Sequence, residues 1–424
     1  MRKADRALIK KMNQQLVLRL IQSRGPIARR DIARISGLSP ASVTGITGEL
    51  IDYGLVQEAG EFEQEERAGR RAILLQLNPK AGFVVGVSLG MHKFTCVLTD
   101  LDANILCSDV HDIPLSDIGP TPYDPDLIIQ SIIQAVDNLL NQTQISTSHL
   151  MGIGIGINGI VDYEAGIAIF APHYGWHDVP LGQAISAHFD VPVHLENDAR
   201  TLTIAEQLFG EGRDVAHFVA VAVGYGIGAG VVTNGQIYRG GIGGAGEFGH
   251  IILQEDGPLC SCGKHGCVES LASVPAIFRE LANALENGEP SRLTHVNRLT
   301  IEAVAAAVQE GDATACRVVA EAGRWLGLGM AMLVNVLNPE LFIINGEAVL
   351  LGDCYLEPME TAMREYAFDG LVDSFRIITE PGGTEVWAQG VASVVLSSLF
   401  TSDKNGRLFM NINPLKDEAA GIIA

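Results

Sequence analysis

The sequence of 424 residues has no apolar run of the roughly 18 to 20 residues that are needed to cross a bilayer. Charges also interrupt its opening segment, MRKADRALIKKMNQQLVLRLIQ, where a secretion signal would need a continuous apolar stretch. We therefore expect a cytoplasmic protein that is not attached to a membrane. Only seven cysteines are present, and in a reducing compartment they serve as metal ligands or core residues more often than as disulfides.

Basic residues are scarce after the first 80 positions. Residues 1–80 contain 14 Lys and Arg against 9 Asp and Glu, a net charge of +5, whereas the remainder contains 15 against 41, a net charge of −26. This asymmetry indicates that only the first 80 residues meet a polyanion such as nucleic acid. A basic surface without a partner is the simpler alternative. Hydrophobic residues make up 47% of the chain, which is typical of a globular protein with a large core.

The segment ARRDIARISGLSPASVTGITGELIDYGLV is typical of a helix-turn-helix. We expect a short helix over residues 29–36, a turn at Gly37, and a second helix that opens at Ser39 as N-cap with Pro40 in the first helical position. Apolar residues that would lock the two helices together are Ile32, Leu38, Val43 and Ile46. Short side chains that the second helix would present to DNA bases are Ser39, Ala41, Ser42, Thr44 and Thr47.

Two apolar segments follow this motif, GLVQEAG and RAILLQLNP, and they predict two strands joined by a loop that ends in Arg70 and Arg71. Such a hairpin resembles the wing of a winged helix, with the two arginines touching phosphate or the minor groove. The alternative is a helical hairpin that packs on the body and binds nothing. The segment NPKAG breaks the pattern, so we place a DNA-binding domain over residues 1–80.

The body alternates short apolar strands with helices, which favours an α/β domain with a mixed sheet. The segments FVVGVSLG, MGIGIGINGIV and FVAVAVGYGIGAGVV predict buried strands that end in glycine turns. The loop GYGIGAG, residues 224–230, has the composition of a phosphate-binding turn, although glycine also permits tight packing between strands. The segment HLENDAR places Asp198 just after a strand, where it could act on a sugar hydroxyl or cap a helix.

The segment GHIILQEDGPLCSCGKHGCVE contains three of the seven cysteines. His250, Cys260, Cys262 and Cys267 form a Cys3His set, the number of ligands in a closed tetrahedral zinc site. Free thiols in a loop are the alternative, and His265 is a rival ligand that we expect to point outward. Glu247 lies three residues before His250 and Glu269 two residues after Cys267, and both could gather with His250 around a polyol if a metal orders the loop.

These motifs together resemble the signature of the ROK family, named for repressors, open reading frames and kinases. The resemblance is carried by GEFGHIILQEDGPLCSCGKHGCVE, IGINGIVDYEAG, PHYGWHDVPL and LENDA, and it extends from about residue 8 to residue 400. With the N-terminal winged helix, the chain is similar to the regulator branch, which includes xylose, N-acetylglucosamine and Mlc-like repressors.

The resemblance implies an actin-like (ribonuclease H-like, duplicated) two-lobed α/β sugar-kinase fold behind an N-terminal winged helix-turn-helix. The smaller lobe would comprise residues 82–200 plus about 386–403, and the larger lobe residues 201–385 with the zinc site. A sugar would lie in the cleft between them. The sugar contacts implied by matching positions are Asn197, Asp198, Glu247, His250, Glu269, Gly159 and His173. The resemblance also implies a structural Zn²⁺ and a homodimer or homotetramer.

Departures from the family pattern distinguish regulator from kinase. Family kinases carry D-x-G-G-T in the first pair of strands, where this chain has Ser88 for the Asp, Met91 for the second Gly and His92 for the Thr. Tyr225 adds bulk to the second phosphate loop, and Glu347 replaces a glycine near the adenosine position. These changes should remove metal–ATP binding, so we expect no kinase activity.

The expected function is therefore a sugar-responsive regulator that binds double-stranded operator DNA, a repressor of carbohydrate uptake or catabolism genes. Two alternatives stay open at this point. One is an ATP-dependent sugar kinase with a fused DNA-binding domain, and the other is a regulator that a protein partner controls.

Overall fold

The computed structural model describes residues 3–61, 72–90, 92–113, 123–296, 298–381 and 384–399. Arg70, Arg71 and Met91 lie outside these residues, so the predicted wing contacts stay predictions. Among the described helices, none combines the length and the apolar character that a membrane span requires.

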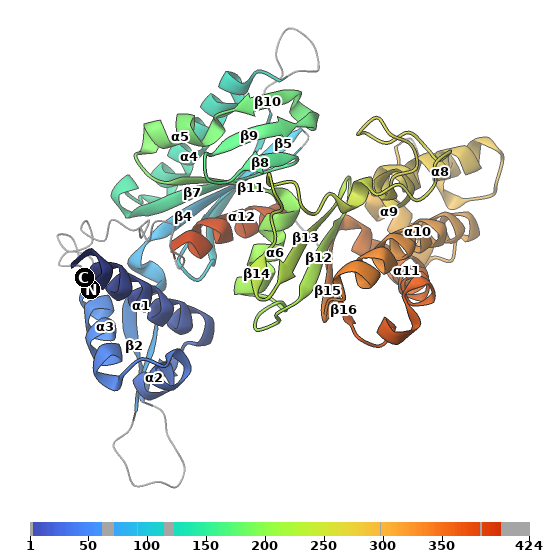
Figure 1. The fold of residues 1–424 in the computed structure, drawn as a ribbon. Helices are drawn as coiled ribbons and strands as arrows, with labels where there is room; N and C mark the ends of the chain where they lie inside the picture. Colours follow the sequence, from blue (N-terminus) through green and yellow to red (C-terminus); the bar gives the residue numbers. More distant parts are fainter. Residues whose placement is uncertain are drawn as a thin grey trace. The chain divides into compact units, whose positions relative to one another are not determined.

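The first domain has the elements expected of a winged helix (Figure 1). The helices are α1 (Lys3–Arg24), α2 (Arg29–Ser36) and α3 (Pro40–Asp52), and the strands are β1 (Ile27–Ala28), β2 (Val56–Glu61) and β3 (Ile73–Leu77). The strands form an antiparallel sheet in the order β1-β3-β2. Gly37 ends α2 with φ of 70°, and the Ser39 hydroxyl accepts a hydrogen bond from the Ser42 N–H at 3.1 Å. The predicted turn and N-cap are therefore confirmed.

A five-stranded mixed sheet follows, in the order β11-β7-β4-β5-β6. Its elements are β4 (Phe83–Leu89), β5 (Lys93–Thr99), β6 (Ile105–Asp112), β7 (Leu150–Ile157) and β11 (Val193–Asn197), with the helices α4 (Pro125–Thr143), α5 (Leu181–Phe189) and α12 (Thr384–Leu399). A small sheet of β8 (Ile160–Asp162), β9 (Ile167–Ala171) and β10 (Trp176–Val179) lies in the order β10-β9-β8.

Glycine in β4 and β7 allows α12 to approach this sheet closely. A Cβ at Gly86 would lie 2.1 Å from the carbonyl oxygen of Ala388, and one at Gly154 would lie 2.4 Å from that of Val391. No side chain fits in such a gap, so the glycine-rich sequence of these strands serves packing.

A second five-stranded sheet has the order β14-β13-β12-β15-β16 and repeats the plan of the first. Its strands are β12 (Phe218–Val223), β13 (Ile227–Thr233), β14 (Gln236–Ile237), β15 (Leu341–Gly346) and β16 (Arg376–Pro381). In each sheet the three strands that come first in the chain are antiparallel neighbours, and the next strand in the chain pairs in parallel with the first of them. These strands are β4, β5, β6 and β7 in one sheet and β12, β13, β14 and β15 in the other. This repetition supports the predicted duplicated, actin-like fold.

Helices cover both faces of the second sheet. On one face lies α6 (Asp198–Leu208), whose Ala199 packs with Ala222 of β12. On the other lie α7 (Val268–Ala272), α8 (Val274–Glu286), α9 (Ile301–Gln309), α10 (Ala313–Leu337) and α11 (Asp353–Tyr366).

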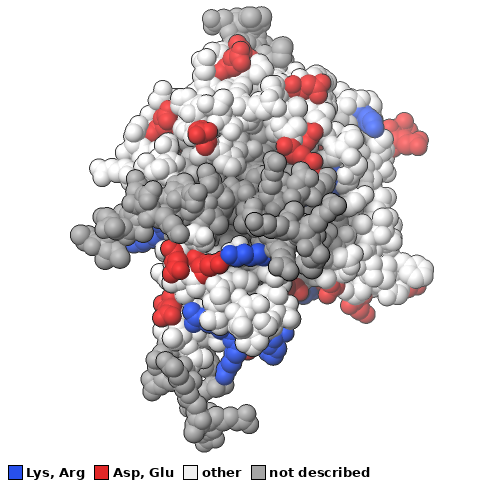
Figure 2. Space-filling view, turned by 60° about the vertical axis from the view of Figure 1, so that its left-hand side comes forward, with Lys and Arg blue, Asp and Glu red and all other residues white. Residues whose placement is uncertain are grey.

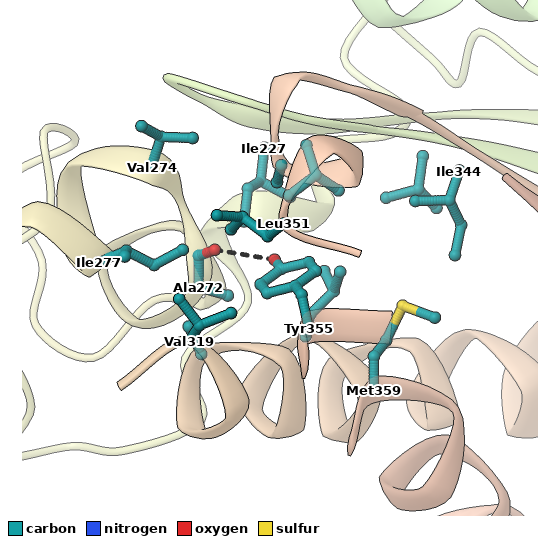
Figure 3. Packing of buried hydrophobic residues seen from close by; sticks show 14 of the residues in the cluster. Ile227, Ala272, Val274, Ile277, Val319, Ile344, Leu351, Tyr355 and Met359 are labelled. Carbon is teal, nitrogen blue, oxygen red and sulfur yellow. Dashed lines mark hydrogen bonds between the residues drawn. The ribbon is translucent and has the colours of Figure 1, made fainter. Parts of the chain in front are cut away.

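The core on this second face is centred on the contact between α10 and α11. Tyr355 is 1% exposed, and its hydroxyl donates a hydrogen bond to the Ala272 carbonyl at 2.9 Å, as Figure 3 shows. A Cβ at Gly323 would lie 2.1 Å from the Tyr355 carbonyl oxygen, so only glycine permits this approach of the two helices.

The chain forms two compact units, one of residues 158–161 and 197–387, and one of residues 1–157, 162–196 and the segment that begins at Ala388. The expected boundary between the lobes, after residue 200, therefore lies four residues beyond the observed boundary, which falls after residue 196. The reason is that α6 belongs to the second sheet, where Ala199 and Thr203 lie over Gly228 and Gly230 of β13. The winged helix belongs to the same unit as the first five-stranded sheet.

Candidate functional site

One atom each from His250, Cys260, Cys262 and Cys267 lies within 4.8 Å of the other three, so these residues could hold a metal ion. The Cys260 sulfur is 3.6 Å from His250 Nδ1, and the sulfurs of Cys262 and Cys267 are 3.7 Å apart. A disulfide requires about 2.05 Å between its sulfurs, so this separation is not that of a disulfide bond. The predicted ligand set is therefore brought together by the fold.

These separations can be tested against the geometry of a tetrahedral ion. With metal–sulfur distances of about 2.3 Å and metal–nitrogen distances of about 2.0 Å, the edges of a tetrahedron are about 3.8 Å for S···S and about 3.5 Å for S···N. Both observed distances agree with these edges to about 0.1 Å. Burial, followed by the neighbouring thiols, raises the pKa of Cys267 to about 12, and a divalent cation would reverse this because metal ligation requires thiolates.

The backbone around the cluster folds through tight glycine turns. Gly263 N–H donates to the Cys260 carbonyl at 2.9 Å, and Cys260 N–H donates to the Lys264 carbonyl at 2.8 Å. Gly266 has φ of 67°, and a Cβ there would lie 1.6 Å from the Gln254 carbonyl oxygen. Cys267 then becomes the N-cap of α7, so its sulfur is placed by a helix start.

His265 is not part of the cluster. It is exposed, and its Nδ1 lies 2.9 Å from the Gly257 carbonyl oxygen. The expectation that this histidine points outward is therefore confirmed.

Glu269 links the cysteine loop to the sheet. Its Oε1 accepts hydrogen bonds from the Ser261 hydroxyl at 2.7 Å and the Cys260 thiol at 3.7 Å, and its Oε2 accepts one from the Ile227 N–H at 3.1 Å. The Ser261 contact was missed from the sequence, where only its place between Cys260 and Cys262 could have suggested it. With three hydrogen bonds already made, Glu269 positions the loop at least as much as it could receive a ligand.

Glu247 lies on the other side of His250. Its Oε2 is 3.9 Å from His250 Nε2, the ring nitrogen that faces away from Cys260. Burial raises the pKa of Glu247, and Asp198 and Glu269 act in the same direction, while His250 and Arg200 lower it. Asp198 and Glu269 are therefore near enough to act on the Glu247 carboxyl group.

Asn197 and Asp198 begin α6. Asn197 is buried and is the N-cap, since its Oδ1 accepts from the Arg200 N–H at 3.3 Å, and its Nδ2 donates to the Gly159 carbonyl at 3.1 Å. Asp198 is half-buried and its Oδ1 accepts from the Ala199 N–H at 2.8 Å. The structure thus gives Asn197 the capping role that the sequence left open for Asp198.

His173 belongs to the other compact unit, in the short helix Pro172–Tyr174.

Arg200 was also missed from the sequence. It is fully buried, and its Nη1 donates to the Ala245 carbonyl at 2.8 Å, two residues before Glu247. The arginine therefore fixes the segment that carries Glu247 and supplies a positive charge near that carboxylate.

The expected loop at residues 224–230 is shorter than predicted. Only residues 224–226 form a turn, because Ile227 already pairs with Val223 in the antiparallel ladder of β12 and β13. A Cβ at Gly224 would lie 2.0 Å from Glu347 Oε2, so the Glu347 carboxylate rests against this turn. A negative charge at that place would repel a phosphate group, which agrees with the predicted loss of nucleotide binding.

Helix α3 presents Ser39, Ala41, Ser42 and Thr44 to solvent, as a recognition helix requires. Thr47 was a wrong prediction, because it is 0% exposed and its hydroxyl accepts a hydrogen bond from Arg29 Nε at 3.0 Å. Thr47 follows Val43 by four residues and therefore shares the buried face of the helix.

The winged helix also has exposed basic side chains in α2. Arg30 and Arg34 of α2 have side chains that are 58% and 72% exposed, and both pair with Asp31. Figure 2 shows mostly Asp and Glu in the upper part of the view, and both Lys and Arg and Asp and Glu in the lower part. The winged helix therefore has exposed basic side chains beside its recognition helix.

The comparisons with known proteins agree with this architecture. The model of the ROK family matches residues 84–397, and a model of winged helix-turn-helix DNA-binding domains matches residues 13–57. The Escherichia coli regulator NagC is 33% identical over 85% of this chain and 86% of its own, and a xylose repressor of Caldicellulosiruptor bescii is 28% identical over 94% and 98%. A solved ROK-family transcriptional regulator, described as a homologue of the E. coli MLC protein, aligns with a TM-score of 0.82 at 31% identity, covering 96% of this chain and 99% of that one.

The similarity to regulators is more complete than the similarity to kinases. A ROK glucokinase from Streptomyces griseus aligns with a TM-score of 0.63 and covers 74% of this chain. The prediction of a regulator rather than an enzyme is therefore confirmed.

Proposed function

The chain belongs to the ROK family, and on that premise we propose that it is a sugar-responsive transcriptional repressor of genes for carbohydrate uptake or catabolism. The observation that carries this proposal is the combination, in one chain, of an exposed recognition helix with a set of polar groups around a possible metal centre. The relatives named xylose repressor and N-acetylglucosamine repressor support a sugar as effector.

The proposed DNA interface is the N-terminal part of α3. Ser39, Ala41, Ser42 and Thr44 would meet base edges in the major groove, while exposed basic residues such as Arg34 would meet phosphates. Arg70 and Arg71 would extend the contact through the wing. Because helix-turn-helix proteins read paired half-sites, we propose that a homodimer or homotetramer binds operator DNA.

The proposed effector site gathers Asp198, Glu247 and His250 in the unit of residues 158–161 and 197–387, with Glu269 holding the metal loop beside them. Carboxylates and amides that accept hydrogen bonds are suited to the hydroxyl groups of a sugar. Asn197, Gly159 and His173 would complete the contacts that the family resemblance implies. Asp198 would bind a hydroxyl as an acceptor.

The proposed metal is a structural Zn²⁺ held by His250, Cys260, Cys262 and Cys267. Three thiolates and an imidazole suit zinc, and the observed edges fit a tetrahedron. A bound ion would fix the Nδ1 side of His250 and leave Nε2 directed toward Glu247. In this way the metal would order the effector site without taking part in a reaction.

The proposal can be tested with labelled DNA from upstream of this gene and of neighbouring sugar genes. Fluorescence anisotropy at fixed salt would measure binding with and without xylose, glucose and N-acetylglucosamine. Tight binding that one sugar reverses would support the proposal and identify the effector. Tight binding that no sugar changes would favour control by a protein partner. Absence of binding to every fragment would contradict the proposal, and an ATP-coupled assay would then test the kinase alternative.

A further inference from the structure

Two cysteines outside the metal cluster meet between α10 and α11. Cys316 lies in the first turn of α10 and Cys354 in the first turn of α11, and their sulfurs are 3.4 Å apart. The Cys354 thiol donates to the Cys316 sulfur, and the Cys316 thiol donates to the Val308 carbonyl at 3.7 Å. Neither the metal cluster nor the proposed DNA interface uses this pair.

The surrounding packing holds the two sulfurs in place. Tyr355, the residue after Cys354, is anchored by its hydrogen bond to Ala272 and by packing against Val319 of α10 (Figure 3). Both sulfur-bearing residues are partly buried against the core of this unit and keep some exposure to solvent. Small reagents can therefore reach them, while the helices keep them together.

We propose that Cys316 and Cys354 are an oxidative modification site, a dithiol that a hydroperoxide converts to an intramolecular disulfide. The sulfurs need to approach by about 1.35 Å to reach the length of a disulfide bond. The bond would close the chain from residue 316 to residue 354, which includes β15 and the Gly346–Glu347 segment, and would join α10 to α11.

The reaction proceeds in two balanced steps. The Cys354 sulfur attacks the O–O bond of the hydroperoxide, which gives a sulfenic acid on Cys354 and releases an alcohol, or water when the oxidant is hydrogen peroxide. The Cys316 sulfur then attacks the sulfenic sulfur, the S–S bond forms, and water leaves with the thiol proton. Cys316 is the second to react, because burial, followed by its hydrogen bond with Cys354, raises its pKa to about 11 and disfavours its thiolate.

Other cysteines provide contrasts. Cys96 is 0% exposed, and Cys107 donates to the Gln142 side chain at 3.7 Å. Among the described residues, Cys316 and Cys354 are the two sulfurs that lie within hydrogen-bond distance of each other outside the metal cluster.

The test uses the full-length, zinc-loaded protein, treated with hydrogen peroxide and digested with trypsin without reductant. Cleavage after basic residues places Cys316 alone in the peptide 299–317 and Cys354 alone in the peptide 325–364. A mass equal to the sum of these peptides minus two hydrogens is expected, and dithiothreitol should remove it. The melting temperature of the oxidised protein should rise by several degrees, because a disulfide restricts the unfolded chain.

Two variants sharpen the test. Cys354→Ser should lose the linked peptide and the shift in melting temperature, whereas the matched variant Cys107→Ser should keep both. If peroxide yields sulfinic acid at Cys354 or oxidises the metal cluster while no linked peptide forms in the wild-type protein, the proposal is wrong. This outcome is read from the wild-type protein, so it does not depend on how the variants fold.

Discussion

The carboxyl groups of Glu206 in α6 and Glu380 in β16 lie next to each other. Glu206 is 5% exposed, and Glu380 projects toward it from β16. Burial, and then the neighbouring Glu380, raise the pKa of Glu206 from 4.5 to about 7. The hydrogen bond between the two side chains acts in the same direction, because two carboxyl groups can share such a bond only while one keeps its proton.

The sign of the effect on stability follows from the raised pKa. Since the folded state keeps a proton that the unfolded state releases, this contribution to the free energy of unfolding is fully present below pH 4.5. It is lost as the pH rises through about 7. A difference between pKa values of 4.5 and about 7 corresponds to about 3 kcal/mol at pH 8.

Glu206→Gln should therefore stabilise the protein at high pH. In the wild-type protein the Glu211 N–H donates to Glu206 Oε2 at 3.1 Å, and a glutamine oxygen can accept the same hydrogen bond. The glutamine NH2 group can in turn donate to Glu380. We expect the variant to exceed the wild type by about 3 kcal/mol at pH 8 and to match it near pH 4.5.

Urea unfolding followed by tryptophan fluorescence at pH 5, 6, 7 and 8 would measure this difference, since Trp325 and Trp387 both lie in the unit concerned. The exposed Glu357 on α11 offers a control, Glu357→Gln, whose difference from wild type should not change over this range. A difference for Glu206→Gln that is equally independent of pH would refute the reasoning.

Four further predictions concern the metal, the effector and DNA. Cys262→Ser removes one of the four proposed metal ligands. The zinc content, measured by plasma mass spectrometry, should therefore fall from about one ion per chain to below about 0.5. Asp198→Asn should weaken the sugar response about tenfold or more in anisotropy titrations while DNA affinity without sugar is unchanged. Arg34→Ala should weaken binding to all DNA sequences and reduce the slope of log affinity against log salt by about 1. Thr47→Ala should destabilise the winged helix by about 1–3 kcal/mol, whereas the exposed Thr44→Ala should alter base preference with little change in melting temperature.

Features that depend on short spacing could be predicted from the sequence. The turn at Gly37 and the cap at Ser39 follow from local backbone preferences, and the ligands Cys260, Cys262 and Cys267 lie within eight residues, so a glycine-rich loop can gather them. His250 lies ten residues before Cys260, and it was the predicted fourth ligand because His265 was expected to point out of the tight loop.

Features that depend on distant pairing were decided by the tertiary structure. The spacing of four residues from Val43 already places Thr47 on the buried face of its helix, but its hydrogen bond with Arg29 joins residues that are 18 apart in the sequence. The contact of Glu206 with Glu380 and the meeting of Cys316 with Cys354 join segments that are 174 and 38 residues apart in the sequence. Sequence patterns describe what each segment can become, but only the packing of helices on the sheets determines which side chains share a buried space, and so which of them bind, titrate or react.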